Sequence, residues 1–229
     1  MLDNLADMKK TAGEIAKKLN KSYYDLDSEN ELHMYIVGSV GRKTAISGNS
    51  DLDILFDLPT SIYSKYNAYS DHGQSALIQD VKNVLKEKYP NTDIRGDGQV
   101  VVIAFNKYTV ELVPGFKQAD DRFKYPDTHD GGSWKYTDPL SEQSACAECE
   151  NESDGKYYDF CHIIRSWKNH IGVKMGGLLI DTLVFDFFNE NGCFVDDSEK
   201  NYLEILQSLF ENLKNQDKDR SYWYAMGSN

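Results

Sequence analysis

The spacing of apolar residues along the 229-residue chain predicts helices near both ends and strands between them. Near the start, apolar side chains recur every three or four positions, as on the buried face of a helix, at Leu5, Met8, Ala12, Ile15 and Leu19. The same spacing predicts further helices over residues 74–88, 156–171, 176–191 and 199–213. We expect the first helix to pack across the body of the protein and to bridge its parts.

Short apolar runs predict four strands, over residues 33–38, 51–59, 99–105 and 108–114. The last two flank a turn at Asn106-Lys107 and are expected to pair. Residues 117–155 are polar and rich in turn-forming residues, which predicts an irregular segment. The pattern therefore predicts an α+β fold, with a mixed sheet and helices over residues 1–155 and a helical lobe over residues 156–229.

Composition narrows the classes of partner and location. The net charge is -12, from 25 Lys and Arg against 37 Asp and Glu, and this argues against a surface built for long nucleic acid duplexes. No apolar run approaches the roughly 20 residues that span a bilayer, and the first residues form an amphipathic helix pattern rather than a signal peptide. These features predict a cytoplasmic protein that is not bound to a membrane. The four cysteines, too few and too clustered for a disulfide framework, are expected to be free thiols.

Three carboxylates are candidates for one site. Asp51 and Asp53 begin a predicted strand, and because side chains alternate along a strand, both point to the same face. Glu111 lies in a later strand, flanked by Val110 and Leu112, and can join them if the two strands are neighbours. Taken alone, a D-x-D pattern is more often a solvated strand end, and a single Glu in a strand is usually an exposed residue.

Three carboxylates without a nearby histidine suit hard divalent ions such as Mg²⁺ or Mn²⁺, which also bind substrate phosphates. Two such ions could activate an attacking hydroxyl and stabilise a departing pyrophosphate. Gly38 lets the backbone approach a phosphate, and the hydroxyl of Ser39 can donate to its oxygens. Arg42 and Lys43 add positive charge nearby. Together these residues indicate metal-dependent nucleotidyl transfer.

The motifs that carry this chemistry resemble a known superfamily. "GS" followed by "SDLDILF" and a later strand acid is similar to the nucleotidyltransferases of the DNA polymerase β type. Within them, the chain resembles the bacterial cGAS/DncV-like nucleotidyltransferases (CD-NTases, with the SMODS domain). The resemblance also covers "GQSALIQDVK", "GDGQVVVIAF", "VELVPGF", "PDTHDGGSWKYTDP", "GGLLIDTLVFDFF" and "RSYWYAMGSN".

The resemblance implies a fold and a set of site residues. The implied fold is the polymerase β-like nucleotidyltransferase core with a C-terminal helical lobe, which we expect to be truncated because "YWYAMGSN" continues in relatives. The implied catalytic and metal-binding residues are Asp51, Asp53 and Glu111, where many members use aspartate in the third position. The implied substrate-binding residues are Gly38, Ser39, Arg42, Ser50, Arg165 and Lys174. Arg165 stands at a position where many relatives have a lysine.

The resemblance also implies an activity: synthesis of cyclic di- or trinucleotides from NTPs, with two Mg²⁺ or Mn²⁺ ions, in CBASS anti-phage defence. The implied partners are NTPs and regulatory or effector proteins of the same defence system, without an obligatory nucleic acid duplex. Two alternatives remain: a nucleotidyltransferase that modifies a protein or an RNA end, and an inactive nucleotide-binding homologue.

Several other residues have competing interpretations. Cys146 and Cys149, with Cys161 or His162, could form part of a zinc site, but a second clean pair is missing, so we interpret the C-x-x-C cysteines as surface residues. Aromatic residues that could stack on a base, although packing is the commoner role, are Trp134, Tyr136 and Tyr222 to Tyr224. His129 and His170 are interpreted as surface residues without an evident partner.

Overall fold

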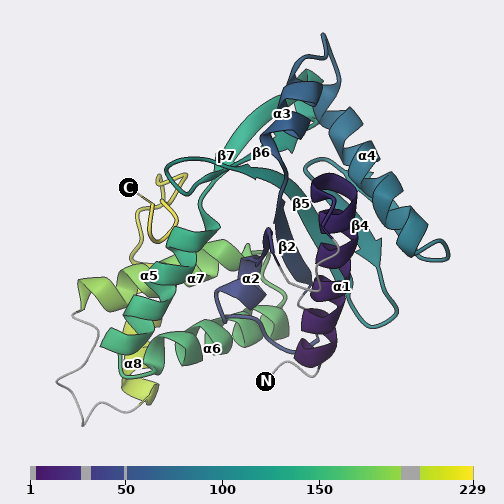
Figure 1. Ribbon diagram of the computed structural model, residues 1–229. Coiled ribbons are helices and arrows are strands. Elements are labelled where there is room, and N and C mark those ends of the chain that lie inside the picture. The colour runs from purple at the N-terminus through teal and green to yellow at the C-terminus, as the bar shows by residue number, and fades with distance from the viewer. Residues whose placement is uncertain (1–3, 27–31, 49–50, 192–201, 229) are drawn as a thin grey trace. The chain divides into compact units, whose positions relative to one another are not determined.

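A computed structural model describes residues 4–26, 32–48, 51–191 and 202–228 (Figure 1). The chain divides into two compact units. The strand-rich unit comprises residues 1–41 and 47–139, and the helical unit comprises residues 42–46 and 140–229. The predicted boundary at residue 155 would place α5 (Pro139–Glu152) with the strands, whereas the structure places nearly all of it in the helical unit.

The strand-rich unit is built on one mixed sheet. Its strands are β1 (Met34–Ile36), β2 (Leu52–Asp57), β3 (Asp93–Asp97), β4 (Val100–Ala104), β5 (Thr109–Lys117), β6 (Phe123–Asp127) and β7 (Ser133–Thr137). The order is β1-β2-β5-β4-β3, and β6 pairs with both β5 and β7. The pair β2 and β5 is parallel and the other pairs are antiparallel. The helices of this unit are α1 (Leu5–Tyr24), α2 (Gly38–Gly41), α3 (Thr60–Asn67), α4 (Gly73–Lys88) and the 3₁₀ turn η1 (His129–Gly131).

Helices α1 and α4 pack on each other and on the strands of this unit (Figure 1). On β2, Leu52, Ile54 and Phe56 are fully buried and alternate with Asp53 and Leu55, which point to the opposite face. A Cβ on Gly96 of β3, in the same row of the sheet as Ile54, would lie 2.6 Å from Cγ2 of Ile78 in α4. The face that carries Ile54 is therefore covered by α4, and Asp53 lies on the other face.

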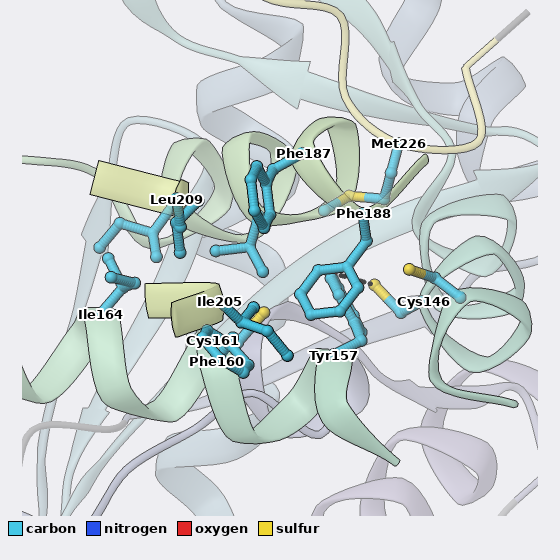
Figure 2. Packing of buried hydrophobic residues seen from close by; sticks show 13 residues of the cluster. Cys146, Tyr157, Phe160, Cys161, Ile164, Phe187, Phe188, Ile205, Leu209 and Met226 are labelled. Carbon is cyan, nitrogen blue, oxygen red and sulfur yellow. Dashed lines mark hydrogen bonds between the residues drawn. The ribbon is translucent and has the colours of Figure 1, made fainter. Parts of the chain in front are cut away.

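The helical unit contains α5, α6 (Lys156–Ile171), α7 (Gly177–Glu190) and α8 (Tyr202–Lys214). Their core is rich in aromatic side chains and includes two cysteines of α5, Cys146 and Cys149 (Figure 2). The phenol of Tyr157 makes a 3.3 Å contact with Sγ of Cys146 and donates to the carbonyl of Asp181 at 3.2 Å. The buried hydroxyl of Tyr157 thus has partners, as buried polar groups generally require.

Most of the predicted elements are confirmed, with differences of a few residues at their ends. The apolar stripe of α1 is buried, and helices and strands occur at each of the predicted positions within the described residues. The helix α1 packs within the strand-rich unit, and its bridging role stays a prediction. Elements that the apolar spacing did not indicate are α2, α3, β3, β6, η1, β7 and α5.

The prediction of an irregular segment over residues 117–155 is wrong. Strands β6 and β7 pair as an antiparallel hairpin around η1, and α5 follows. Helix α5 buries small side chains, among them the two C-x-x-C cysteines, so it lacks the leucine and isoleucine spacing that identifies a helix in sequence. Among the described residues, no helix combines the length and the apolar character that a membrane crossing requires.

Candidate active site

Asp53 and Glu111 lie directly opposite each other on the neighbouring parallel strands β2 and β5. Adjacent strands are about 4.8 Å apart, so the two carboxylates project side by side from one face of the sheet. Asp51 is exposed and directly precedes β2. The structure therefore confirms that the two strands are neighbours, as expected, and this places Glu111 beside Asp53.

Gly38 lies against the carboxylate of Asp53. A Cβ built on Gly38 would lie 1.7 Å from Oδ2 of Asp53, so any side chain at this position would clash with the carboxylate. The backbone N–H of Val37 donates to the carbonyl of Asp53 at 2.9 Å, and Gly38 then turns the chain with a φ of +60° into α2. Only glycine adopts this conformation readily and also leaves room for the carboxylate. Ser39 follows in α2 and is half-buried.

Glu111 is held in an unfavourable electrostatic environment. Burial, followed by the charges of Asp51 and Asp97, raises the pKa of Glu111, and the guanidinium of Arg95 partly opposes that shift. Each of these causes except Arg95 disfavours the ionised form. The strand-rich unit therefore concentrates negative charge at Glu111, and a bound cation would relieve this repulsion.

Arg95 and Asp97 were not identified from the sequence, because β3 was not predicted. Arg95 pairs with Val102 of β4, and Val102 pairs with Glu111, so the three residues share one row of the sheet. Asp97 ends β3 and is followed by Gly98 with a φ of +59°. An Asp-Gly pair before an apolar run is a hairpin signal, and it would have found this strand.

The donor set at this end of β2 and β5 fits a hard divalent ion, because it consists of carboxylate oxygens only. The repulsion at Glu111 is the structural observation that agrees with this chemistry. Over residues 4–26, 32–48, 51–191 and 202–228, no three His, Cys, Asp or Glu side chains form a group that could hold a metal ion. Asp53 and Glu111 thus share one face, but the three candidate acids are not drawn together around a common centre.

The structure gives the guanidinium groups of Arg42 and Arg165 protein partners in the helical unit. Both donate to Asp181 of α7, which is fully buried: Nε of Arg42 lies 3.0 Å from Oδ2, and Nε and a terminal nitrogen of Arg165 lie 2.9 and 2.7 Å from Oδ1 and Oδ2. Arg42 also pairs with Glu142 at 2.8 Å, and Thr44 donates to Asp181 at 2.7 Å. Phosphate binding by either arginine stays a prediction.

The remaining predicted substrate-binding residues are less constrained. Lys174 is exposed between α6 and α7, and Ser50 lies outside the described residues. Lys43 is exposed with a φ of +62°, and its carbonyl contacts Nε2 of His162 at 3.1 Å. Their roles stay predictions.

The interpretation of Cys146 and Cys149 as surface residues is wrong, because both belong to the core of the helical unit, as does Cys161. These three cysteines are free thiols, as expected, and Cys193 lies outside the described residues. Burial raises the pKa of Cys146 to about 11, so its thiol stays protonated and is a poor metal ligand. In the part of the chain that the structure describes, no metal-binding group includes a cysteine.

The interpretation of His129 as having no partner is also wrong, since its Nδ1 lies 2.6 Å from Oδ1 of Asp127. His170 is exposed, as expected. The indole of Trp134 donates to Asn67 at 3.0 Å and packs edge-on against Tyr63, which is a packing role. Of the remaining aromatic candidates, Tyr136, Tyr222 and Tyr224 are exposed, and Trp223 is half-buried.

Comparisons with known proteins identify the family. The model of the Second Messenger Oligonucleotide or Dinucleotide Synthetase (SMODS) domain matches residues 2–150. A search of curated proteins gave no significant match.

Three solved structures share the fold. Rhodothermus marinus CdnE c-UMP-AMP synthase, with Apcpp and Upnpp, is 16% identical with a TM-score of 0.66, over 92% of this chain and 78% of that one. A STING-associated CdnE c-di-GMP synthase from Flavobacteriaceae sp. is 12% identical with a TM-score of 0.69, over 95% and 71%. E. coli MS115-1 CdnC, in complex with HORMA-deltaN, is 19% identical with a TM-score of 0.66, over 91% of this chain and 64% of that one.

These likenesses confirm the predicted polymerase β-like nucleotidyltransferase fold. The family model covers well over half of the chain and includes α2, β2 and β5, which carry the candidate site. The chain therefore belongs to the SMODS family of bacterial cGAS/DncV-like nucleotidyltransferases, enzymes that make cyclic oligonucleotides, as its motifs predict.

Proposed function

We propose that this protein joins NTPs into a cyclic di- or trinucleotide in a reaction that depends on divalent metal ions. The observation that supports this proposal best is the pairing of Asp53 with Glu111 on parallel strands, with Gly38 against the Asp53 carboxylate. This arrangement puts two acids and a backbone turn suited to phosphate at the same end of β2. Base identity and the 2′ or 3′ linkage depend on side chains that this arrangement does not specify.

The proposed roles follow from the chemistry of each group. Asp51, Asp53 and Glu111 would hold Mg²⁺ or Mn²⁺, two ions in the full site, which neutralise phosphate charge and lower the pKa of an acceptor hydroxyl. Gly38 keeps side-chain atoms away from the site, so that the backbone can approach a phosphate. The hydroxyl of Ser39 donates to a phosphate oxygen.

The proposed partners come from the relatives. R. marinus CdnE was solved with Apcpp and Upnpp, and E. coli CdnC in a complex with HORMA-deltaN. By analogy, we propose that NTPs are the substrates here, and that a regulatory or effector protein of the same CBASS anti-phage system is a partner. We also propose that the protein acts in the cytoplasm, where NTPs are available.

The decisive experiment measures products. The purified protein is incubated with all four NTPs and Mg²⁺ or Mn²⁺, treated with phosphatase, and its products are weighed by mass spectrometry. We expect phosphatase-resistant masses without a terminal phosphate, pyrophosphate release that EDTA abolishes, and a loss of at least about 100-fold in Asp53→Asn. Asp71→Asn, which changes an exposed aspartate between α3 and α4, should match the unchanged protein.

Each other outcome selects an alternative. If the products are only linear oligonucleotides, or nucleotide attached to a protein or an RNA end, the result would favour a nucleotidyltransferase that modifies a protein or an RNA end. An absence of pyrophosphate release, even with cell extract added, would favour an inactive nucleotide-binding homologue. Activity near wild type in Asp53→Asn would remove the carboxylate assignment.

A further inference from the structure

A pocket of about 540 Å³ lies in the strand-rich unit at the carboxyl ends of β2 and β5. Its walls include Tyr24 at the end of α1, Asp57 at the end of β2 and Tyr63 of α3. Asp57 is four residues beyond Asp53, which corresponds to about 13 Å along a strand. The pocket is therefore separate from the candidate active site, and its volume is within the range of small-molecule sites.

Two lysines face this pocket, Lys117 of β5 and Lys124 of β6. The ammonium group of Lys124 lies 4.7 Å from the ring centroid of Tyr63 and 5.3 Å from that of Tyr136, and it donates to the Tyr63 hydroxyl at 3.3 Å. Among the described residues, no carboxylate lies within ion-pair distance of Lys124. Its positive charge is therefore available to an anion.

The second lysine and the one carboxylate of the pocket are already engaged. Lys117 pairs with the exposed Asp121 at 2.8 Å, a pair that water screens. Asp57 accepts the backbone N–H of Lys117 at 2.7 Å, and burial raises the pKa of Asp57. The pocket lining therefore carries two lysines against one carboxylate, in a chain whose net charge is -12.

Aromatic rings form much of the remaining wall. The ring centroids of Tyr63 and Phe116 lie 5.3 Å apart at an angle of 67°, so the two rings meet edge to face and form a rigid corner. Tyr24 is fixed on the other side, because it stacks on His33 at 3.8 Å and donates to the carbonyl of Asp57 at 3.0 Å. Fixed aromatic walls favour a flat apolar ring as the ligand.

We propose that this pocket binds a small molecule that carries a flat ring and an anionic group, with the anion at Lys124 and the ring against Tyr63 and Phe116. The inference depends on this pocket alone and would stand if the proposed catalytic function failed. A carboxylate and a phosphate would satisfy the same lysine, and the experiment distinguishes them.

The experiment titrates the full chain with simple probes while ¹H–¹⁵N spectra are recorded. Benzoate and phenyl phosphate present a ring with each type of anion, benzamide lacks the charge, and cyclohexanecarboxylate lacks the flat ring. We expect at least one anionic aromatic probe to shift the amide signals of residues 57, 58, 60 and 116–119, and to bind at least about 10-fold more tightly than either control probe.

Two variants complete the experiment. Lys124→Gln should weaken the anionic probe at least about 10-fold with an otherwise unchanged spectrum. Lys9→Gln, which changes an exposed lysine of α1, should leave binding unchanged. A preference for benzoate or for phenyl phosphate identifies the anion as carboxylate or phosphate. Equal binding of benzamide, full affinity in Lys124→Gln, or shifts confined to residues near Asp53 would each overturn the proposal.

Discussion

Gly38 sets how closely the backbone approaches the carboxylate of Asp53. Two independent features require glycine at this position: a φ of +60°, and an Oδ2 atom of Asp53 only 1.7 Å from where a Cβ would stand. Because of the positive φ, a substitution of Gly38 lowers the stability of the protein. Because of the close Oδ2 atom, the new Cβ also displaces the Asp53 carboxylate. The two effects can be separated, because other glycines share the backbone conformation without the neighbouring acid.

We expect Gly38→Ala to lower the rate of nucleotidyl transfer by at least about 100-fold, because a displacement of about 1 Å at a reacting centre has an effect of this size. Gly131→Ala is the matched control: Gly131 has a φ of +88°, and nothing lies within 4 Å of its Cβ position. The prediction is tested by measuring the rate of pyrophosphate release and the melting temperature of both variants. Equal losses of activity in the two would show that backbone strain, and not the Asp53 carboxylate, is responsible.

Within the helical unit, helix α7 carries the acid on which three side chains depend. Asp181 lies in the apolar run "GGLLIDTLVFDFF" and accepts hydrogen bonds from Arg42, Thr44 and Arg165. Arg42 and Thr44 belong to the short segment 42–46 that clusters with the helical unit, although the residues on either side belong to the strand-rich unit. Asp181 therefore anchors the segment 42–46 within the helical unit.

We expect Asp181→Asn to destabilise the protein by about 3–5 kcal/mol, since it leaves buried guanidinium groups without their carboxylate. For a chain of this size the melting temperature should fall by about 6–20 °C. The control is Asp7→Asn, which breaks an exposed ion pair with Lys107 and should change the melting temperature by less than about 2 °C. Similar melting temperatures for both variants would contradict the anchoring role of Asp181.

The elements show which parts of the fold the sequence could predict. Strands β2 and β5 can be predicted from their short apolar runs, and the alternation of side chains along a strand then places Asp53 and Glu111 on the candidate face. Helix α5 was missed because its buried face uses cysteine and other small side chains, which give little apolar signal. The partners of Arg42 and Arg165 could not be predicted, because Asp181 is 139 and 16 residues away from them and only the tertiary fold brings them together.

At the scale of the whole molecule, charge determines which large ligands the protein can hold. The chain has 37 acidic and 25 basic residues, and several of the lysines and arginines are neutralised by carboxylates, among them Arg42, Lys88, Lys107 and Arg165. Binding to a duplex gains most of its free energy from lysines and arginines that replace counterions along the phosphates. We therefore expect an acidic chain with many paired cations to have little affinity for long DNA or RNA.

We expect product formation from NTPs to proceed at the same rate, within about twofold, with and without a nuclease-resistant duplex. The measurement compares initial rates at about 50 and 200 mM salt, since any contribution from phosphate contacts falls steeply over that range. Free Mg²⁺ is held constant, because the duplex itself binds the ion and would otherwise change the rate. A strict requirement for duplex, lost at the higher salt concentration, would mean that the fold assembles a local basic surface despite the overall charge. An equal rate under all four conditions would show that synthesis does not depend on contacts with a nucleic acid duplex.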